Sequence, residues 1–231
     1  MIDPRPFAAL GTFQNEWLNA HYHFSFSDYH DPLRMNWGAL RVWNDDTIKA
    51  KTGFPPHSHA NMEIITYVRT GAITHQDSLG NKGRTEAGDV QVMSAGSGVT
   101  HAEYNLEDED TTLFQIWIQP KVLGGPPSWQ AAKFPKTDGL KVFASGFEDD
   151  QAAGALPIRQ DARVLGGVLK AGESATYQIR GGRGAYAVLS RGAAIINGKK
   201  LGPRDGAAVA GDGDLRIEAQ EEAELVIVDT P

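Results

Sequence analysis

Four residues with the chemistry of metal ligands lie in two closely spaced pairs, His57 with His59 and His101 with Glu103. In an extended strand, residues i and i+2 point to the same face about 7 Å apart, so each pair would share one face. Two such strands side by side would aim all four side chains at one point. Three neutral imidazoles and one carboxylate suit iron, nickel, copper or zinc better than magnesium or calcium. The spacing therefore predicts a mononuclear metal site with open coordination positions.

Two alternatives to this interpretation stay open. A His-x-His pair also occurs on strands whose histidines only make hydrogen bonds, and such a satisfied polar core needs no metal. Glu63 follows His59 by four residues and faces the same side if the strand continues without a bulge, so it competes as the fourth ligand. We favour Glu103 because its neighbour His101 fixes its direction. We expect His75 to be a structural hydrogen-bonding residue.

The composition is that of an ordinary soluble globular protein. The 231 residues suffice for one large or two small domains, with 41% hydrophobic and 22% charged residues. A net charge of -7 argues against direct nucleic-acid binding, which needs a basic surface. The absence of cysteine excludes disulfides and thiolate chemistry. The N-terminus lacks the layout of a signal peptide, and no apolar run approaches the ~20 residues that span a bilayer, so we expect a cytoplasmic protein without membrane contact.

Short alternating runs bounded by turn residues recur along the whole chain, whereas long stretches with helical period are hard to find. This pattern predicts an all-β protein of antiparallel strands. It breaks between Pro120 and Pro135, where we expect one or two helical turns over residues 128–133. We place the domain boundary here, with a metal-binding domain over residues 1–135 and a second domain over residues 136–231.

The second half repeats the strand pattern of the first without its ligands. Asn197-Gly198 predicts a tight hairpin, because both positions tolerate positive φ, and residues 78–81 predict another hairpin loop. None of the seven histidines lies beyond residue 101, so the second domain cannot hold the same metal. We expect it to be structural or to shape the cleft. The pattern as a whole predicts two tandem antiparallel jelly-roll β-sandwiches with few short helices.

The ligand motifs resemble those of the cupins. The first cupin block fits His57-Ser-His59-x3-Glu63 with Gly71 downstream. The second block is altered, because Ser94 stands where cupins usually have proline and four residues separate Gly96 from His101. These departures are similar to the pirin branch of the cupins. The similarity covers most of residues 20–120 and is carried by residues 23–32, 40–46, 53–59, 62–67, 75–81, 93–96 and 101–105.

The resemblance implies a bicupin whose N-terminal domain binds one divalent transition metal through His57, His59, His101 and Glu103. The expected ion is Fe(II), with Zn, Ni, Cu, Mn or Co as substitutes. The shorter bacterial pirins resemble quercetin 2,3-dioxygenases, which implies an enzyme that opens the central ring of flavonols with O2 and releases carbon monoxide. Glu103 would also be catalytic, as acceptor of the substrate's 3-hydroxyl proton.

A different reading of the same resemblance is a regulator rather than an enzyme. Some pirins look like partners of transcription factors or metabolic enzymes, with the iron oxidation state altering a surface loop. The acidic surface would suit a basic partner, although a solvated acidic surface is the commoner reason for such a charge. In either case we expect a monomer, with a small aromatic substrate in the first reading and a protein partner in the second.

Overall fold

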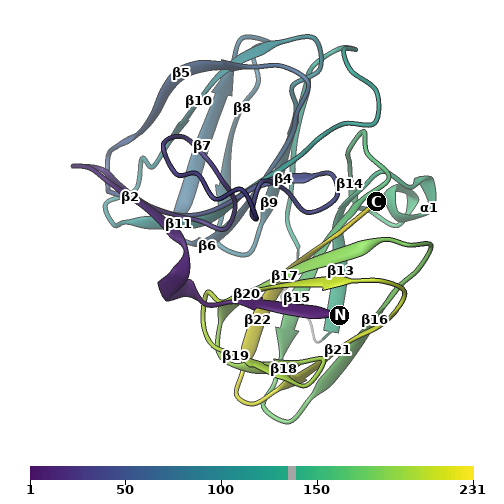
Figure 1. The fold of residues 1–231 in the computed structure, drawn as a ribbon. Coiled ribbons are helices and arrows are strands. Elements are labelled where there is room, and N and C mark those ends of the chain that lie inside the picture. The colour runs from purple at the N-terminus through teal and green to yellow at the C-terminus, as the bar shows by residue number, and fades with distance from the viewer. Residues whose placement is uncertain (135–138) are drawn as a thin grey trace.

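The computed structural model describes residues 1–134 and 139–231, and strands make up most of this part of the chain. Figure 1 shows the strands in two bodies, with the blue and teal half of the chain above the green and yellow half. The described helices are short, η1 (Phe7–Ala9) and α1 (Glu148–Ala152). The predicted fold class, an all-β bicupin with few short helices, is confirmed. Within the described ranges, neither helix has the length or the apolar character needed to cross a membrane.

The first body, called the first sandwich here, consists of a large and a small antiparallel sheet. The large sheet runs in the order β12 (Ser128–Ala132), β9 (Val90–Ser94), β6 (Glu63–Thr70), β11 (Thr111–Ile118), β4 (Leu40–Ile48), β3 (Leu18–Tyr22) and β2 (Gly11–Gln14). The small sheet runs in the order β5 (Gly53–His59), β10 (Val99–Tyr104), β7 (Ala72–Asp77) and β8 (Lys82–Glu86).

The second body, called the second sandwich here, has the same two-sheet plan. Its large sheet runs in the order β1 (Ile2–Arg5), β20 (Gly206–Ala210), β17 (Gly184–Arg191), β22 (Ala223–Thr230), β15 (Arg163–Leu169), β13 (Gly139–Ser145) and β14 (Leu156–Pro157). Its small sheet runs in the order β16 (Ser174–Ile179), β21 (Gly213–Ala219), β18 (Ala194–Ile196) and β19 (Lys199–Leu201). An apolar core of leucine, isoleucine, valine and alanine fills the space between these two sheets.

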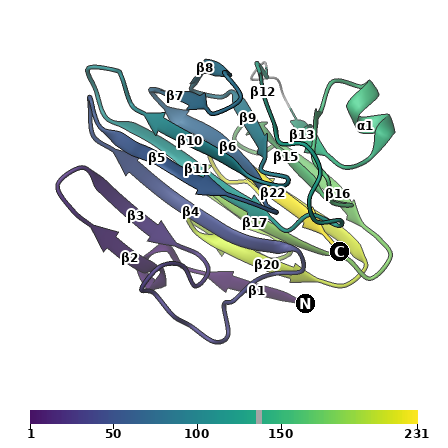
Figure 2. The same cartoon turned by 90° about the horizontal axis from the view of Figure 1, so that it is seen from above.

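The N-terminal strand β1 crosses from one body to the other. It pairs antiparallel with β20, so the first residues of the chain extend the large sheet of the second sandwich, as Figure 2 shows. The four-residue stretch of β1 carries no pattern that reveals where it pairs. The domain boundary predicted between residues 135 and 136 lies outside the described residues and stays a prediction.

Both predicted hairpins are confirmed. Asn197 and Gly198 connect β18 to β19 with φ of 45° and 78°, the left-handed region that this turn requires. Residues 78–81 connect β7 to β8. The predicted helical turns over residues 128–133 are wrong, because Ser128–Ala132 forms β12 and pairs with β9. A helix of one or two turns has little stability of its own. The strand is favoured by the packing of Trp129, whose ring stacks on that of His75 with 4.8 Å between the ring centroids.

The two large sheets face each other, and their outer faces form a shared core. Trp43, Tyr67 and Phe114 of the first sandwich pack there with Tyr186 of the second. Because side chains alternate along a strand, every second residue of β4 and β11 enters this shared core and the others enter the first sandwich. The large sheet of the first sandwich therefore separates two interiors.

A buried ion pair also joins the two bodies. The Asp45 side chain is fully buried on the outer face of β4, where it contacts Arg69 of β6 and Arg204 of the second sandwich. Arg204 Nε lies 2.6 Å from Asp45 Oδ2. Arg69 is itself only 9% exposed and depends on this carboxylate for compensation of its charge.

We predict that Asp45→Ala lowers the free energy of unfolding by about 3 to 5 kcal/mol, because it removes the ion-pair partner of the buried Arg69 guanidinium. Urea denaturation followed by circular dichroism measures this change. Asp108→Ala is the matched control, since it removes an aspartate whose pair with Lys51 is exposed. The control should leave the midpoint where it is in the wild type. Equal midpoints for both variants would contradict a stabilising role of Asp45.

Candidate metal centre

The structure brings the three predicted histidine ligands together on two adjacent strands of the small sheet. His57 and His59 lie on β5, and His101 lies on β10 directly opposite His57 in the register. One nitrogen from each ring lies within 4.8 Å of the others. The ring centroids of His57 and His101 are 4.4 Å apart. The i, i+2 spacing on paired strands thus produces the convergence that the sequence predicts.

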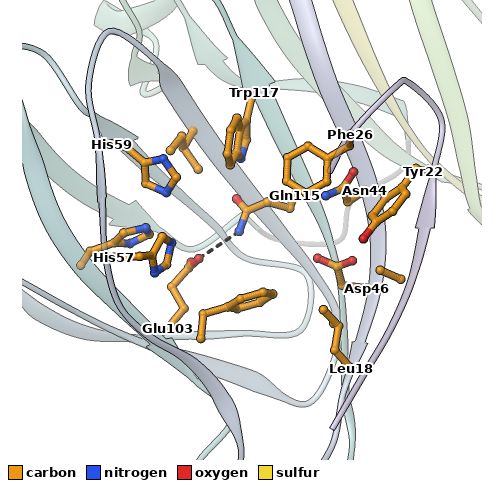
Figure 3. A pocket seen from close by; sticks show the side chains of 14 residues that line it. Leu18, Tyr22, Phe26, Asn44, Asp46, His57, His59, Glu103, Gln115 and Trp117 are labelled. Atoms are coloured by element: carbon orange, nitrogen blue, oxygen red, sulfur yellow. Dashed lines mark hydrogen bonds between the residues drawn. The ribbon is translucent and has the colours of Figure 1, made fainter. Parts of the chain in front are cut away.

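Glu103 lies on β10 after a bulge that shifts the register between His101 and Glu103. Its carboxylate groups with the nitrogens of His101 and His75, again within 4.8 Å, and it lines the same cavity as His57 and His59. Figure 3 shows the carboxylate beside the imidazole rings and directed toward Gln115. Glu103 is therefore near the histidine cluster, and its role as fourth ligand stays a prediction.

Glu63, the competing fourth ligand, lies elsewhere. The chain turns at Asn61, whose φ is +55°, and passes from the small sheet into β6 of the large sheet. Buried Glu63 accepts a hydrogen bond of 2.5 Å from Ser94 Oγ and belongs to neither group of potential metal ligands among the described residues. The condition that the strand continues unbroken from His59 to Glu63 is not met.

A chain of hydrogen bonds from Asp77 through His75 orients the His101 ring. His75 Nε2 lies 3.0 Å from Asp77 Oδ2, and His75 Nδ1 lies 3.4 Å from His101 Nδ1. An ionised carboxylate only accepts, so His75 donates from Nε2 and accepts at Nδ1 from His101. This assignment leaves His101 Nε2 as a free lone pair. His75 thus has the structural hydrogen-bonding role predicted from the sequence, with the added effect of fixing the tautomer of a candidate ligand.

The surroundings of His59 and His101 favour their neutral forms. Burial and the nearby His57 lower the pKa of His59 to about 4. Burial and the neighbouring histidines lower the pKa of His101 to about 3. Although burial opposes it, the hydrogen bonds from His75 and Asn81 lower the pKa of Asp77. Neutral imidazoles are the form that binds metals.

A row of polar side chains across the large sheet holds the Glu103 carboxylate. Gln115, Thr66 and Gln91 are in register on β11, β6 and β9. Gln91 Nε2 donates to Glu103 Oε1 at 2.6 Å and Gln115 Nε2 donates to Oε2 at 2.9 Å. Thr66 Oγ1 donates to Gln115 Oε1 at 3.1 Å. Burial raises the pKa of Glu103 to about 7, and these hydrogen bonds oppose the increase.

This polar row was not predicted from the sequence. Its signal was present, because Thr66, Gln91 and Gln115 each interrupt an apolar run at an inward-facing strand position. A polar residue in such a place needs a buried partner. The identity of the partner depends on the sheet register, which the sequence did not provide.

The candidate ligands line one end of a cavity inside the first sandwich, called the central cavity here. Its volume is about 220 Å³. Its walls are mostly aliphatic and aromatic, with polar groups at two ends. It is lined by Leu18, Ala20, Tyr22, Phe26, Asn44, Asp46, Phe54, His57, His59, Ile64, His101, Glu103, Gln115 and Trp117.

The residues of the cluster fit a divalent transition metal. His101 Nε2 is buried and has no hydrogen-bond partner in the described parts of the chain. An imidazole nitrogen left in this state costs free energy, which coordination to a cation would offset. His57 Nδ1 donates to the Pro55 carbonyl at 2.8 Å, so its Nε2 also carries a free lone pair. Three imidazoles with a nearby carboxylate form a donor set that iron, nickel, copper and zinc accept.

Comparisons with known proteins agree with this geometry. The family model described as Pirin matches residues 5–118, and the model described as Quercetinase C-terminal cupin domain matches residues 142–230. The Pirin-like protein of Caulobacter vibrioides is 61% identical over 99% of both chains. Quercetin 2,3-dioxygenase of Escherichia coli K12 is 38% identical over 100% of this chain and 99% of its own. The crystal structure of the E. coli bacterial pirin YhhW in complex with nickel(II) has a TM-score of 0.95 at 38% identity, covering 100% of this chain and 99% of that chain.

We predict that Asp77→Asn weakens Ni(II) binding by at least about tenfold. The amide would present a donor to His75 Nε2, so the hydrogen-bond chain would no longer leave a lone pair on His101 Nε2. Isothermal titration calorimetry with the metal-free protein measures the dissociation constant.

His30→Ala is the matched control for this experiment, because His30 is exposed and lies outside the central cavity. The control should bind one Ni(II) with wild-type affinity. Unchanged affinity in Asp77→Asn would show that the tautomer of His101 does not depend on Asp77.

Proposed function

The chain belongs to the pirin family, and from this premise we propose that it is a metal-dependent dioxygenase of the quercetin 2,3-dioxygenase type. The reaction opens the central ring of a flavonol with O2 and releases carbon monoxide. The observation that carries the proposal is the placement of three convergent imidazoles and a buried carboxylate at one end of an apolar, aromatic-lined cavity. The quercetin 2,3-dioxygenase name of the E. coli relative supports the substrate class.

We propose His57, His59, His101 and Glu103 as the residues that hold the metal. When bound, a divalent ion would supply Lewis acidity and a template for the 3-hydroxyl and 4-carbonyl of the flavonol. Fe(II) is the proposed ion, and Ni(II), which the E. coli pirin structure contains, is a substitute that the same donor set accepts.

The apolar walls of the cavity orient the substrate. Phe54, Ile64 and Trp117 line it, so a planar aromatic molecule would exchange water for hydrocarbon and ring contacts on binding. The Trp117 ring also packs edge-on against His59 at 4.9 Å, which limits the rotation of that imidazole. Both effects hold the substrate and the candidate ligands in one geometry and exclude water from the reaction.

Glu103 is the proposed acceptor of the proton from the flavonol's 3-hydroxyl. Its Oε2 accepts a hydrogen bond from Gln115 and retains capacity for a further one. Gln91 and Gln115 each donate a hydrogen bond to one oxygen of the carboxylate. These bonds keep it oriented toward the histidine cluster while it takes up or releases the proton. O2 adds to the resulting substrate anion at C2 and C4, and the C2–C3, C3–C4 and O–O bonds break. C3 leaves with its own oxygen as carbon monoxide, and the two atoms of O2 remain in the ester and carboxylate of the product.

We predict that His101→Ala lowers quercetin turnover by at least about 100-fold, because the histidine cluster loses its buried member. The measurement is loss of the flavonol absorbance band under O2 together with carbon monoxide release, with Fe(II)-reconstituted protein. His30→Ala should retain wild-type turnover. Wild-type protein that binds one metal and leaves quercetin intact would contradict the dioxygenase proposal and leave the metal site standing.

A second prediction separates the two glutamates. Glu103→Gln should lower kcat by about 10² to 10⁴, the usual contribution of a general base, while KM changes much less. Steady-state kinetics with quercetin measures both constants. The matched control is Glu63→Gln, which alters the acid bonded to Ser94 outside the central cavity and should leave kcat within a few-fold of wild type. The reverse result would assign the catalytic role to Glu63.

A further inference from the structure

The end of the central cavity opposite the histidines carries a polar pair that the metal and Glu103 do not use. Asp46 and Asn44 lie on the inner face of β4 and are only 2% and 5% exposed. Figure 3 shows both side chains on the far wall, beside Tyr22 and across the cavity from His57 and His59. Oδ1 of each has no hydrogen-bond partner in the part of the chain that the structure describes.

The register partners of Asp46 on the two adjacent strands do not supply that partner. Its neighbours across β3 and β11 are Ala20 and Leu113, which carry no polar side-chain atoms. The next residue along the strand, Asp45, faces the other way and has two arginine partners. A buried carboxyl without a partner is costly and uncommon, so it calls for an occupant of the cavity that can form hydrogen bonds.

The pair can both donate and accept. Burial, with the charges of Asp45 and Glu103, raises the pKa of Asp46 well above its usual value, which favours the protonated form of the carboxyl. Its O–H donates and its second oxygen accepts, while Asn44 offers Oδ1 as an acceptor. A phenolic hydroxyl, which is also donor and acceptor, matches both residues.

We propose that Asp46 and Asn44 bind a hydroxyl on the pendant aryl ring of the flavonol, and that the protein selects flavonols hydroxylated on that ring. The inference rests on the proposed function and deepens it by defining the substrate class. It assigns the two residues to recognition, at a distance from the reacting atoms.

The size of the cavity limits which ring of the flavonol can contact Asp46 and Asn44. Its volume of about 220 Å³ is below the ~300 to 1,000 Å³ of sites that enclose a drug-sized ligand. We therefore assign a single six-membered ring to the end lined by Leu18, Ala20 and Tyr22. The fused ring system stays at the end near His57 and His59, which are only half-buried. The pendant ring is therefore the part that meets Asp46.

The test compares quercetin with galangin, a flavonol that is identical except that its pendant ring has no hydroxyls. Titration calorimetry under argon with the full-length protein loaded with Ni(II) gives both dissociation constants without turnover. The wild type should bind quercetin roughly 5- to 10-fold more tightly, the effect of one or two buried hydrogen bonds. Asp46→Leu should bring the two affinities within about twofold by weakening quercetin binding alone.

Three further variants make the result specific. Asn44→Leu should also reduce the preference and serves if Asp46→Leu does not fold. Asp46→Asn keeps a donor and an acceptor and should retain the preference. Phe54→Leu changes an apolar wall and should weaken both flavonols equally. Asp46→Leu should unfold at or above the wild-type temperature, with a rise of up to roughly 6 °C, because it removes a buried group without a partner.

Equal affinity of the wild type for the two flavonols would overturn the inference. A preference for quercetin that survives in both Asp46→Leu and Asn44→Leu would also overturn it, and so would the absence of binding of either flavonol. Turnover under O2 is measured separately. A binding preference without quercetin turnover would overturn the proposed function alone. Turnover with no preference between the two flavonols would overturn the recognition role of Asp46 alone.

Discussion

The structure depends on the alternation of side chains in the large sheet of the first sandwich. On β4, Trp43 and Asp45 enter the shared core between the two bodies, whereas Asn44 and Asp46 enter the central cavity. A shift of one residue in the register would exchange these two sets and place the ion pair in the cavity. The packing between the sandwiches therefore also holds the cavity wall in place.

The polar groups inside the first sandwich divide into two kinds. Asp77, His75, Gln91 and Gln115 have partners, and their hydrogen bonds fix the directions of His101 and Glu103. Other buried atoms have no hydrogen-bond partner among the residues that the structure describes, and His101 Nε2 and Asp46 Oδ1 are two of them. Buried atoms of the second kind lower stability, and proteins concentrate such atoms where a ligand completes them. Their position at opposite ends of one cavity is the physical basis for assigning one end to a metal and the other to a substrate hydroxyl.

Among the described residues, the second sandwich contributes no candidate ligand, and it packs against the first. Its large sheet covers the outer face of the first, and its Arg204 compensates Asp45. Within the shared core, a hydrogen bond of 2.8 Å joins the Tyr186 hydroxyl oxygen and His23 Nδ1. A sheet packed on both sides deforms little, which suits a site whose ligands must stay within a few tenths of an ångström.

The sequence by itself determined the fold class, the two hairpins and the three histidines that converge, because period-two spacing acts within one strand and needs no knowledge of the partner strand. The separation of Glu63 from the histidine cluster became visible only in the structure, because it depends on a change of sheet at Asn61 that a strand pattern does not reveal. Gln91, Gln115 and Asp46 also acquired their meaning only from the register. Residues distant in sequence become neighbours through strand pairing, and tertiary packing, as at Trp129, decides the conformation of short segments whose own preference is weak.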